Sequence, residues 1–95
     1  MAKDTRSKVI ITVAGKDAVG IIARICTYLS ENGVNILDIS QTIVDEFFHM
    51  MMVADLTGKE TSFSRLQQEL SEVGEQIGVE VHCQKAEIFE MMHRL

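Results

Sequence analysis

The residues best suited to chemistry lie in one glycine-bearing segment, Gly15-Lys16-Asp17-Ala18-Val19-Gly20-Ile21, and at Asn35. The segment separates an expected strand from an expected helix. Because the first backbone N–H groups of a helix have no partner within it and the helix dipole favours negative charge there, such a segment can hold an anion. Asn35 is expected to open the second strand near the same end of the sheet, and its amide offers both a donor and an acceptor. Together these groups could hold the carboxylate and the amine of a small amino acid.

The same residue types also fit a purely structural role. Gly15 and Gly20 can form a tight turn without any ligand. Asp17 can accept the amine of a ligand, or it can cap the following helix. The residue types alone therefore leave a binding site and a plain turn both open.

Apolar residues that alternate with polar ones predict strands, and apolar residues three or four positions apart predict helices. Asn32-Gly33 and Gly78 are expected to end the two main helices, and Thr61 or Ser62 to cap the start of the second. Residues 14–17 are expected to form a turn. The patterns predict strands over residues 8–13, 34–44, 47–56 and 79–83, helices over 20–32 and 63–77, and a short C-terminal helix over 86–95.

This order of elements predicts an α+β fold of the ferredoxin-like βαββαβ type, a four-stranded antiparallel sheet with two helices on one face. The first and third strands are expected in the middle, and the half-polar second strand at an edge. We expect a second copy of the chain, or the C-terminal helix, to cover the apolar residues on the other sheet face. Residues 1–95 are expected to form a single domain, with a core over about 8–84 and a helical extension over 86–95.

The charge balance excludes several partner classes. The net charge is −5, from 9 basic and 14 acidic side chains, and the basic residues are scattered. Nucleic acids and anionic membranes are therefore unexpected partners, since both require clustered cations. No apolar stretch approaches the ~20 residues needed to cross a bilayer. With a polar N-terminus, these features predict a cytoplasmic protein in which Cys26 and Cys83 are reduced core thiols.

No catalytic, metal or cofactor site is expected, and the protein is not expected to be an enzyme. The sequence lacks a Cys–His or Ser–His–Asp arrangement in the setting that a nucleophile requires. His82 and Cys83 are neighbours on an expected strand, so their side chains should point to opposite faces. That arrangement is poor geometry for binding a metal ion.

Residues 11–23, Ile-Thr-Val-Ala-Gly-Lys-Asp-Ala-Val-Gly-Ile-Ile-Ala, followed by Gly33-Val34-Asn35-Ile36, resemble the signature of the ACT domain family. The resemblance covers about residues 8–84. It is closest to small stand-alone ACT proteins and to the N-terminal ACT modules of formyltetrahydrofolate deformylase and the glycine-cleavage regulator. It implies binding of a regulatory amino acid between two ACT domains. The implied ligand-binding residues are Gly15, Asp17, Ala18, Val19, Gly20, Ile21, Asn35 and Ile36.

The segment departs from serine-sensing members of the family, which use a His and an Asn of the first loop and an Asn of the second strand. Asn35 matches the last of these, but Gly15 and Asp17 occupy the other two positions. The carboxylate of Asp17 would repel a ligand carboxylate beside it, which disfavours serine in that pose. The resemblance thus predicts a homodimeric sensor of an amino acid or related metabolite that signals to a separate protein. The alternative is a protein–protein interaction module without a ligand, which would use the apolar sheet face or the C-terminal segment.

Overall fold

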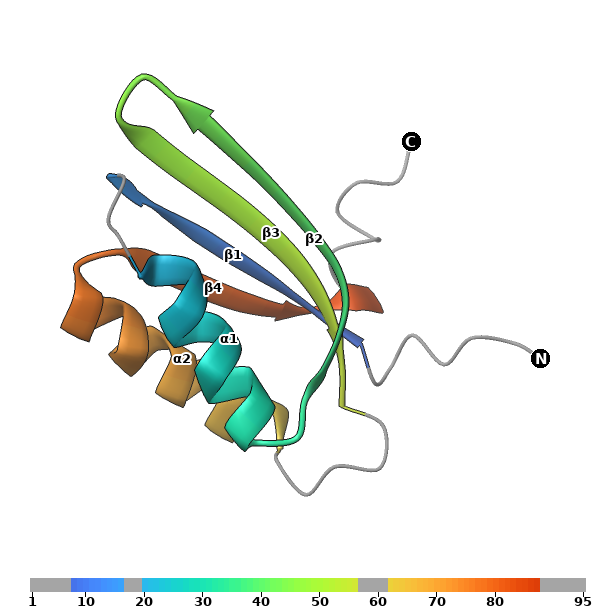
Figure 1. The fold of residues 1–95 in the computed structure, drawn as a ribbon. Helices are drawn as coiled ribbons and strands as arrows, with labels where there is room; N and C mark the ends of the chain where they lie inside the picture. Colours follow the sequence, from blue (N-terminus) through green and yellow to red (C-terminus); the bar gives the residue numbers. More distant parts are fainter. Residues whose placement is uncertain (1–7, 17–19, 57–61, 88–95) are drawn as a thin grey trace.

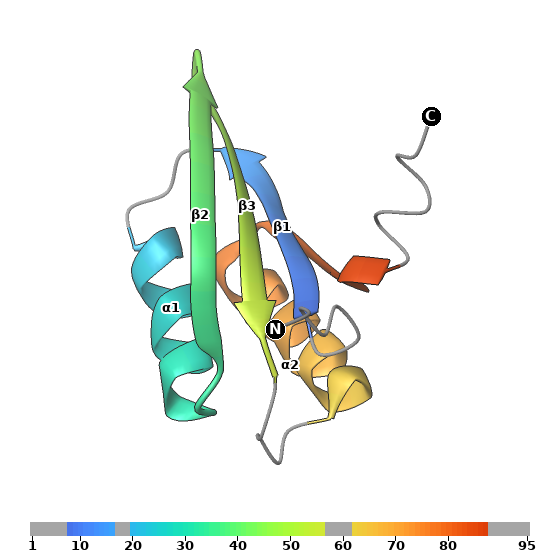
Figure 2. The ribbon, with the colours of Figure 1, turned by 90° about the vertical axis from the view of Figure 1, so that its right-hand side faces the viewer.

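The computed structural model describes residues 8–16, 20–56 and 62–87. The elements in chain order are β1 (Lys8–Lys16), α1 (Ile21–Glu31), β2 (Asn35–Val44), β3 (Phe47–Asp55), α2 (Phe63–Ile77) and β4 (Glu80–Lys85). The strands form one antiparallel sheet in the order β2-β3-β1-β4. Both helices lie on the same face of this sheet (Figure 1; Figure 2). The ferredoxin-like fold, the central position of β1 and β3 and the edge position of β2 are all confirmed.

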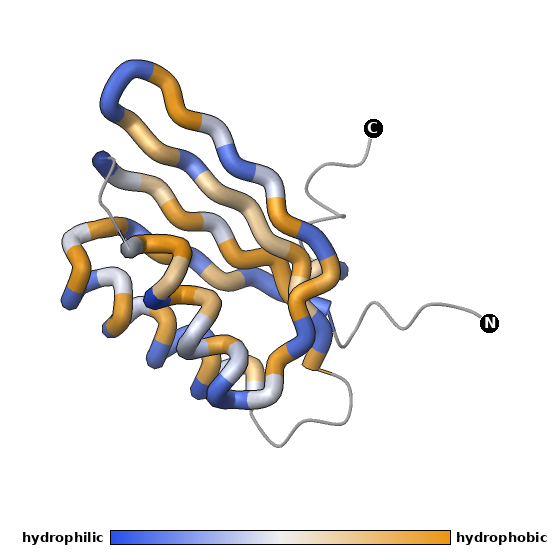
Figure 3. Tube along the Cα trace, viewed as in Figure 1, coloured by the Kyte–Doolittle hydropathy of each residue, from blue (hydrophilic) through white to orange (hydrophobic). Residues whose placement is uncertain are grey.

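The core lies between the helices and the sheet face that they cover. Alternate residues of the two central strands are buried there, as period-two patterning requires. Each helix presents one apolar side to the sheet, and Figure 3 shows hydrophobic and hydrophilic positions alternating along both. The buried helix residues are Ile21, Ile25 and Leu29 of α1 and Leu66, Leu70 and Gly74 of α2.

The expected helix boundaries are confirmed. The backbone N–H of Arg65 donates a 3.1 Å hydrogen bond to the hydroxyl of Ser62, which makes Ser62 the N-cap of α2. Gly78 ends α2 with φ at 79°, and Gly33 follows α1 with φ at 70°. Both glycines therefore occupy the left-handed conformation that closes a helix at low steric cost.

The expected turn at residues 14–17 is wrong for residues 14–16, because β1 continues through Lys16. These three residues lie opposite residues 47–49 of β3. The partner strand offers a continuous row of backbone donors and acceptors, which extends β1 beyond the point where its own alternation of apolar residues stops. Gly15 is consequently a strand residue.

An unpredicted β-bulge interrupts β2. The pairing of β2 with β3 shifts between Ile36 and Asp38. Leu37 is therefore an extra residue in β2, with no residue of β3 opposite it. Beyond the bulge, the β2–β3 hairpin extends past the helices (Figure 1). Ile43 and Val44 lie in this outer part, where no helix covers them, and they are 57% and 66% exposed.

The second face of the sheet is only partly covered by the described residues. On β3, Phe47 and His49 are exposed on this face, whereas Met51 and Val53 are half-buried. The expected cover of this face, by a second copy of the chain or by the C-terminal helix, stays a prediction. Of the expected C-terminal helix, Ala86 and Glu87 are helical, and residues 88–95 lie outside the described residues. Neither described helix is long and apolar enough to cross a membrane.

Candidate functional site

Among the described residues, no side chain caps the backbone donors at the start of α1. Gly20 occupies the N-cap position with φ at 92°, and its side chain cannot accept a hydrogen bond. Its carbonyl oxygen accepts the first helical bond, from Arg24 N at 2.9 Å. Ile21, the first helical residue, is buried, so it contributes only its backbone N–H to the surface. This helix terminus can attract an anion through its dipole and its N–H groups.

Gly20 is required for its backbone angle and not for close packing. Apart from its two chain neighbours, no described residue has an atom within 4 Å of the place where a Cβ would stand, so the space beside it is open. An L-amino acid with a side chain would be strained at this φ. The neighbouring predicted site residues Asp17, Ala18 and Val19 lie outside the described residues.

Gly15 is required for close packing against Val79, the residue just before β4. A Cβ at this position would lie 2.7 Å from Cγ1 of Val79. The residue lines a shallow open depression together with Ala14, Gly78, Val79 and Glu80. Its absence of a side chain therefore has a structural cause, whether or not a ligand binds nearby.

Asn35 does not lie beside the β1–α1 segment within one chain, contrary to the expectation that both share one end of the sheet. Asn35 pairs with Asp55 of β3, whereas Gly15 pairs with Phe48. The two β3 partners are seven residues apart (55 − 48), which at 3.3 Å per residue is about 23 Å. The reason is that α1 returns the chain to the opposite end of the sheet before β2 begins (Figure 1). Ile36 is half-buried next to Asn35 and pairs with Ala54.

A second depression was not predicted from the sequence. It lies at the Asn35 end of the sheet, on the face away from the helices, and has a volume of about 530 Å³. Its lining residues come from β1, β2 and β3. They are Lys8, Leu37, Asp38, Val53 and Asp55. The bulge at Leu37, which has no recognisable signal in a single sequence, brings the β2 residues into this set.

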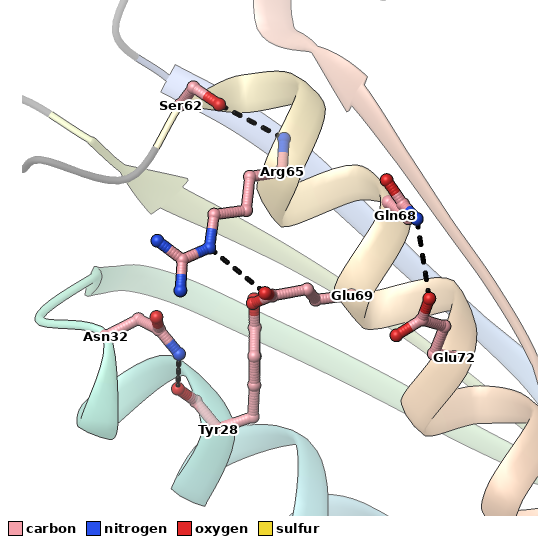
Figure 4. A network of polar contacts seen from close by, with 7 residues as sticks. All are labelled: Tyr28, Asn32, Ser62, Arg65, Gln68, Glu69 and Glu72. Atoms are coloured by element: carbon pink, nitrogen blue, oxygen red, sulfur yellow. Dashed lines mark hydrogen bonds and ion pairs between the residues drawn. The ribbon is translucent and has the colours of Figure 1, made fainter.

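A polar network joins the outer sides of the two helices (Figure 4). The Tyr28 hydroxyl donates a 2.5 Å hydrogen bond to Oε1 of Glu69, and Nε of Arg65 lies 3.0 Å from Oε2 of the same carboxylate. Burial, followed by the bond to Glu69, raises the pKa of Tyr28 above its ordinary range. The hydrogen bonds from Tyr28 and then Arg65 lower the pKa of Glu69. The network fixes α1 against α2 and holds the tyrosine in its neutral form.

The cysteines and the histidine beside them are unsuited to nucleophilic or metal chemistry. Burial raises the pKa of Cys83 to about 12, and burial also raises the pKa of the half-buried Cys26. Both thiols therefore stay protonated near neutral pH. Cys83 is buried and His82 exposed, so the predicted opposite orientation is confirmed. Within the part of the chain that the structure describes, no group of three or more His, Cys, Asp or Glu side chains could hold a metal ion.

The strand order β2-β3-β1-β4, with both helices on one face (Figure 1), places this chain in the class of ferredoxin-like domains, and sequence comparison identifies the family within it. The model of the ACT domain family matches residues 7–84. The chain therefore belongs to the ACT domain family, whose members are ligand-binding regulatory domains.

Two relatives match nearly the whole chain. A UPF0237 protein of Bifidobacterium longum is 53% identical over 89 residues, which cover 94% of this chain and 99% of the relative. The structure of an ACT domain protein from Streptococcus pneumoniae is 43% identical, with a TM-score of 0.77 over 87% of this chain and 93% of that one. This chain is thus similar to small proteins that consist of little more than one such domain.

The expected likeness to two larger proteins is also confirmed at the level of the fold. A protein described as a glycine cleavage system transcriptional repressor has a TM-score of 0.72 at 22% identity, over 81% of this chain and 44% of that one. A formyltetrahydrofolate deformylase from Pseudomonas putida has a TM-score of 0.72 at 14% identity, over 81% of this chain and 28% of that one. In both, the matched part is a fraction of a longer protein.

Proposed function

We propose that this chain is a homodimeric sensor that binds a free amino acid or a related metabolite between two copies. The observation that carries the proposal is the separation of Asn35 from the N-terminus of α1. Each chain has one half of the candidate site at each end of its sheet. A second copy can complete the site by supplying the missing half.

Antiparallel pairing of two β2 edges would bring the halves together. β2 runs parallel to β1, because both are antiparallel to β3. The last residue of β2, Val44, therefore lies at the same end as Lys16, from which the chain continues to α1. If two β2 strands pair about a two-fold axis, Asn35 of one copy lies beside the Val44 end of the other. That position is at the same end of the sheet as the start of α1, which runs alongside the inner part of β2 (Figure 2).

The character of the β2 edge supports this pairing. Leu37, Ile39 and Ile43 are 45%, 40% and 57% exposed along it. An exposed apolar edge strand with free backbone groups favours pairing with another chain, and natural proteins rarely leave one uncovered. The site so formed would place helix N–H groups around a carboxylate and the Asn35 amide around an amine.

The proposed sensor acts in the cytoplasm on a separate protein that carries the output, and it is not an enzyme. The similarity to small UPF0237 proteins supports this view, as do the two protonated thiols, which are poor nucleophiles. Asp17 and its neighbours are proposed contacts on the strength of the family resemblance alone.

The test is a thermal-shift screen of the common amino acids and related metabolites. A ligand present at 100 times its dissociation constant should stabilise the folded dimer by about 2.7 kcal/mol. The shift should disappear in Asn35→Ala and persist in the matched control Gln84→Ala, an exposed residue on the far edge strand. Retention of the full shift in Asn35→Ala would contradict the proposed site.

The dimer has its own test. Ile39 lies next to the midpoint of β2 (Asn35–Val44), so in a symmetric pair the two copies of residue 39 would lie close together. Ile39→Glu should therefore give a monomer in sedimentation and should lose the ligand response. A wild-type monomer, or a panel without any hit on an intact dimer, would instead favour the ligand-free interaction module.

A further inference from the structure

The sheet ends in two edge strands, β2 and β4, and the described residues place no strand on the outer side of either. Such an edge can pair with another chain through its backbone groups. β2 is ten residues long and exposes apolar side chains, among them Ile39 and Ile43. β4 is six residues long, and its exposed residues, Glu80, His82 and Gln84, are polar. The two edges therefore differ in how well they suit pairing.

A side chain of α2 occupies the outer side of β4. Nε2 of Gln67 donates a 2.9 Å hydrogen bond to the backbone oxygen of Cys83. Leu66 and Leu70 of the same helix are buried against the sheet, whereas Gln67 is exposed. The Gln67 amide thus reaches β4 from its outer side, and the Cys83 carbonyl points away from β1.

This carbonyl lies at the centre of the outer row of β4. Every second residue of a strand directs its backbone groups to the same side, so Val81, Cys83 and Lys85 form the outward-facing set. A strand added antiparallel to β4 would donate a backbone N–H to the Cys83 oxygen. The Gln67 amide nitrogen already occupies that position.

A second contact with α2 lies at the end of the same row. Nζ of Lys85 is 5.5 Å from the centroid of the Phe63 ring, in the first turn of α2. This distance suits a cation–π interaction. A lysine on an edge strand also disfavours the approach of another strand. Beyond Lys85 the chain is helical at Ala86 and Glu87, so the outer row ends there.

We propose that Gln67 closes the β4 edge against pairing with β4 of a second copy of this chain. Two antiparallel β4 strands related by a two-fold axis at Cys83 would exchange N–H···O=C bonds at this residue. Gln67 takes the acceptor of that exchange, and α2 holds the glutamine in place. The closure of β4 does not depend on the proposed dimer. Its consequence, that copies pair only through β2, rests on that proposed function.

The test uses the Ile39→Glu chain, in which pairing through β2 is blocked. In this background Gln67→Ala should double the mass of the sedimenting species as the concentration rises from about 10 µM to about 1 mM, a range that populates weak contacts. Alanine is the best helix former, so α2 should persist. A variant that keeps the mass of the background, with an unchanged circular dichroism spectrum, would overturn the proposal.

The matched control is Gln68→Ala in the same background. Gln68 is the next residue of α2, and its amide lies 3.5 Å from a carboxylate oxygen of Glu72 in the same helix. Its loss removes a glutamine without freeing a strand carbonyl, so the mass should not change. Equal association of the Gln67→Ala and Gln68→Ala chains would contradict the role assigned to the bond to Cys83.

Hydrogen exchange locates the contact. In a pair formed through β4, the N–H groups of Val81, Cys83 and Lys85 face the added strand. Their exchange in the Gln67→Ala chain should therefore be about tenfold slower at the higher concentration. Association that leaves these three rates unchanged would assign the contact to another surface and reject the proposal.

The same substitution in a chain with the natural β2 separates this proposal from the proposed dimer. If β2 pairs as proposed, Gln67→Ala gives each copy two open edges, and assemblies should grow with concentration instead of stopping at a closed pair. If only the β2 dimer is wrong, Gln67→Ala should stop at a pair formed through β4. If the closure of β4 is wrong, Gln67→Ala should sediment as the wild type does.

Discussion

The hydroxyl of Tyr28 on α1 donates a 2.5 Å hydrogen bond to Oε1 of Glu69 on α2, so the outer surfaces of the two helices are tied by a side-chain bond. Tyr28→Phe keeps the ring and removes only this bond. Because the pair is half-exposed, we expect the free energy of unfolding to fall by about 0.5–1 kcal/mol. Urea denaturation at pH 7 measures the change. Arg65→Gln, which breaks only the more exposed contact, should cost less.

The Glu69 carboxylate makes part of the stability depend on pH. Its pKa is lowered in the folded protein by the Tyr28 hydrogen bond and then by Arg65. A lowered folded-state pKa contributes stability above the ordinary glutamate value of about 4.3, and this contribution is lost as pH falls through the folded-state pKa. Wild type should therefore be more stable than Glu69→Gln at pH 7, and the difference should vanish toward pH 3. A difference that stays constant with pH would contradict this account.

The close approach of Gly15 to Val79 predicts a pair of coupled substitutions. A Cβ at residue 15 would lie 2.7 Å from Cγ1 of Val79, so Gly15→Ala should destabilise the fold by about 1–3 kcal/mol. In a Val79→Ala background the Cγ1 methyl is absent and only Cβ of residue 79, at 3.1 Å, stays close, so the added cost of Gly15→Ala should fall. Thermal unfolding of the four proteins measures the coupling. Simple additivity would show that the glycine is required for another reason.

Gly74 of α2 also packs too closely for a side chain, in this case against a backbone atom as well as a methyl group. A Cβ there would lie 2.8 Å from the backbone oxygen of Val79 as well as 2.7 Å from Cγ2 of Val81. A backbone obstacle cannot rotate away, so Gly74→Ala should destabilise more than Gly15→Ala, and Val81→Ala should not rescue it fully. Full rescue would indicate that the strand can shift to accommodate the added methyl.

The thiol of Cys83 should be unreactive in the folded protein. Burial raises its pKa to about 12, so its thiolate is scarce at pH 8. Ellman's reagent should modify Cys83 only when the protein unfolds, whereas both thiols should react in denaturant. Because the unfolded thiol ionises above about pH 8.5 and the buried one does not, stability should fall as pH rises beyond that value. Cys83→Ala should reduce this dependence and leave the smaller part that Cys26 contributes.

Much of the fold could be predicted because its signals are local. Ser62 and Gly78 mark the ends of α2 through short-range capping and backbone geometry. The alternation along β1 and β3 marks the residues buried beneath the helices, and Ile10, on the other face, is the buried exception in β1. The family resemblance also implies the topology in which these elements are arranged.

The features that escaped prediction depend on neighbours distant in sequence. Residues 14–16 became strand because β3 lies beside them. Asn35 was assigned to the wrong end of the sheet because the strand order, and not the residue types, sets its position. The depression beside Lys8 draws residues from three strands and exists only after the sheet has assembled.

The bulge at Leu37 also has a consequence for how the chain can change in length. Successive strand side chains alternate between faces, so deletion of Ser40 would turn part of β2 inside out. Deletion of Leu37 would instead remove the extra residue, and Asp38 would follow Ile36 directly on the opposite face, where it already lies. Homologues one residue shorter in this strand should therefore carry their alignment gap at this position and retain the fold.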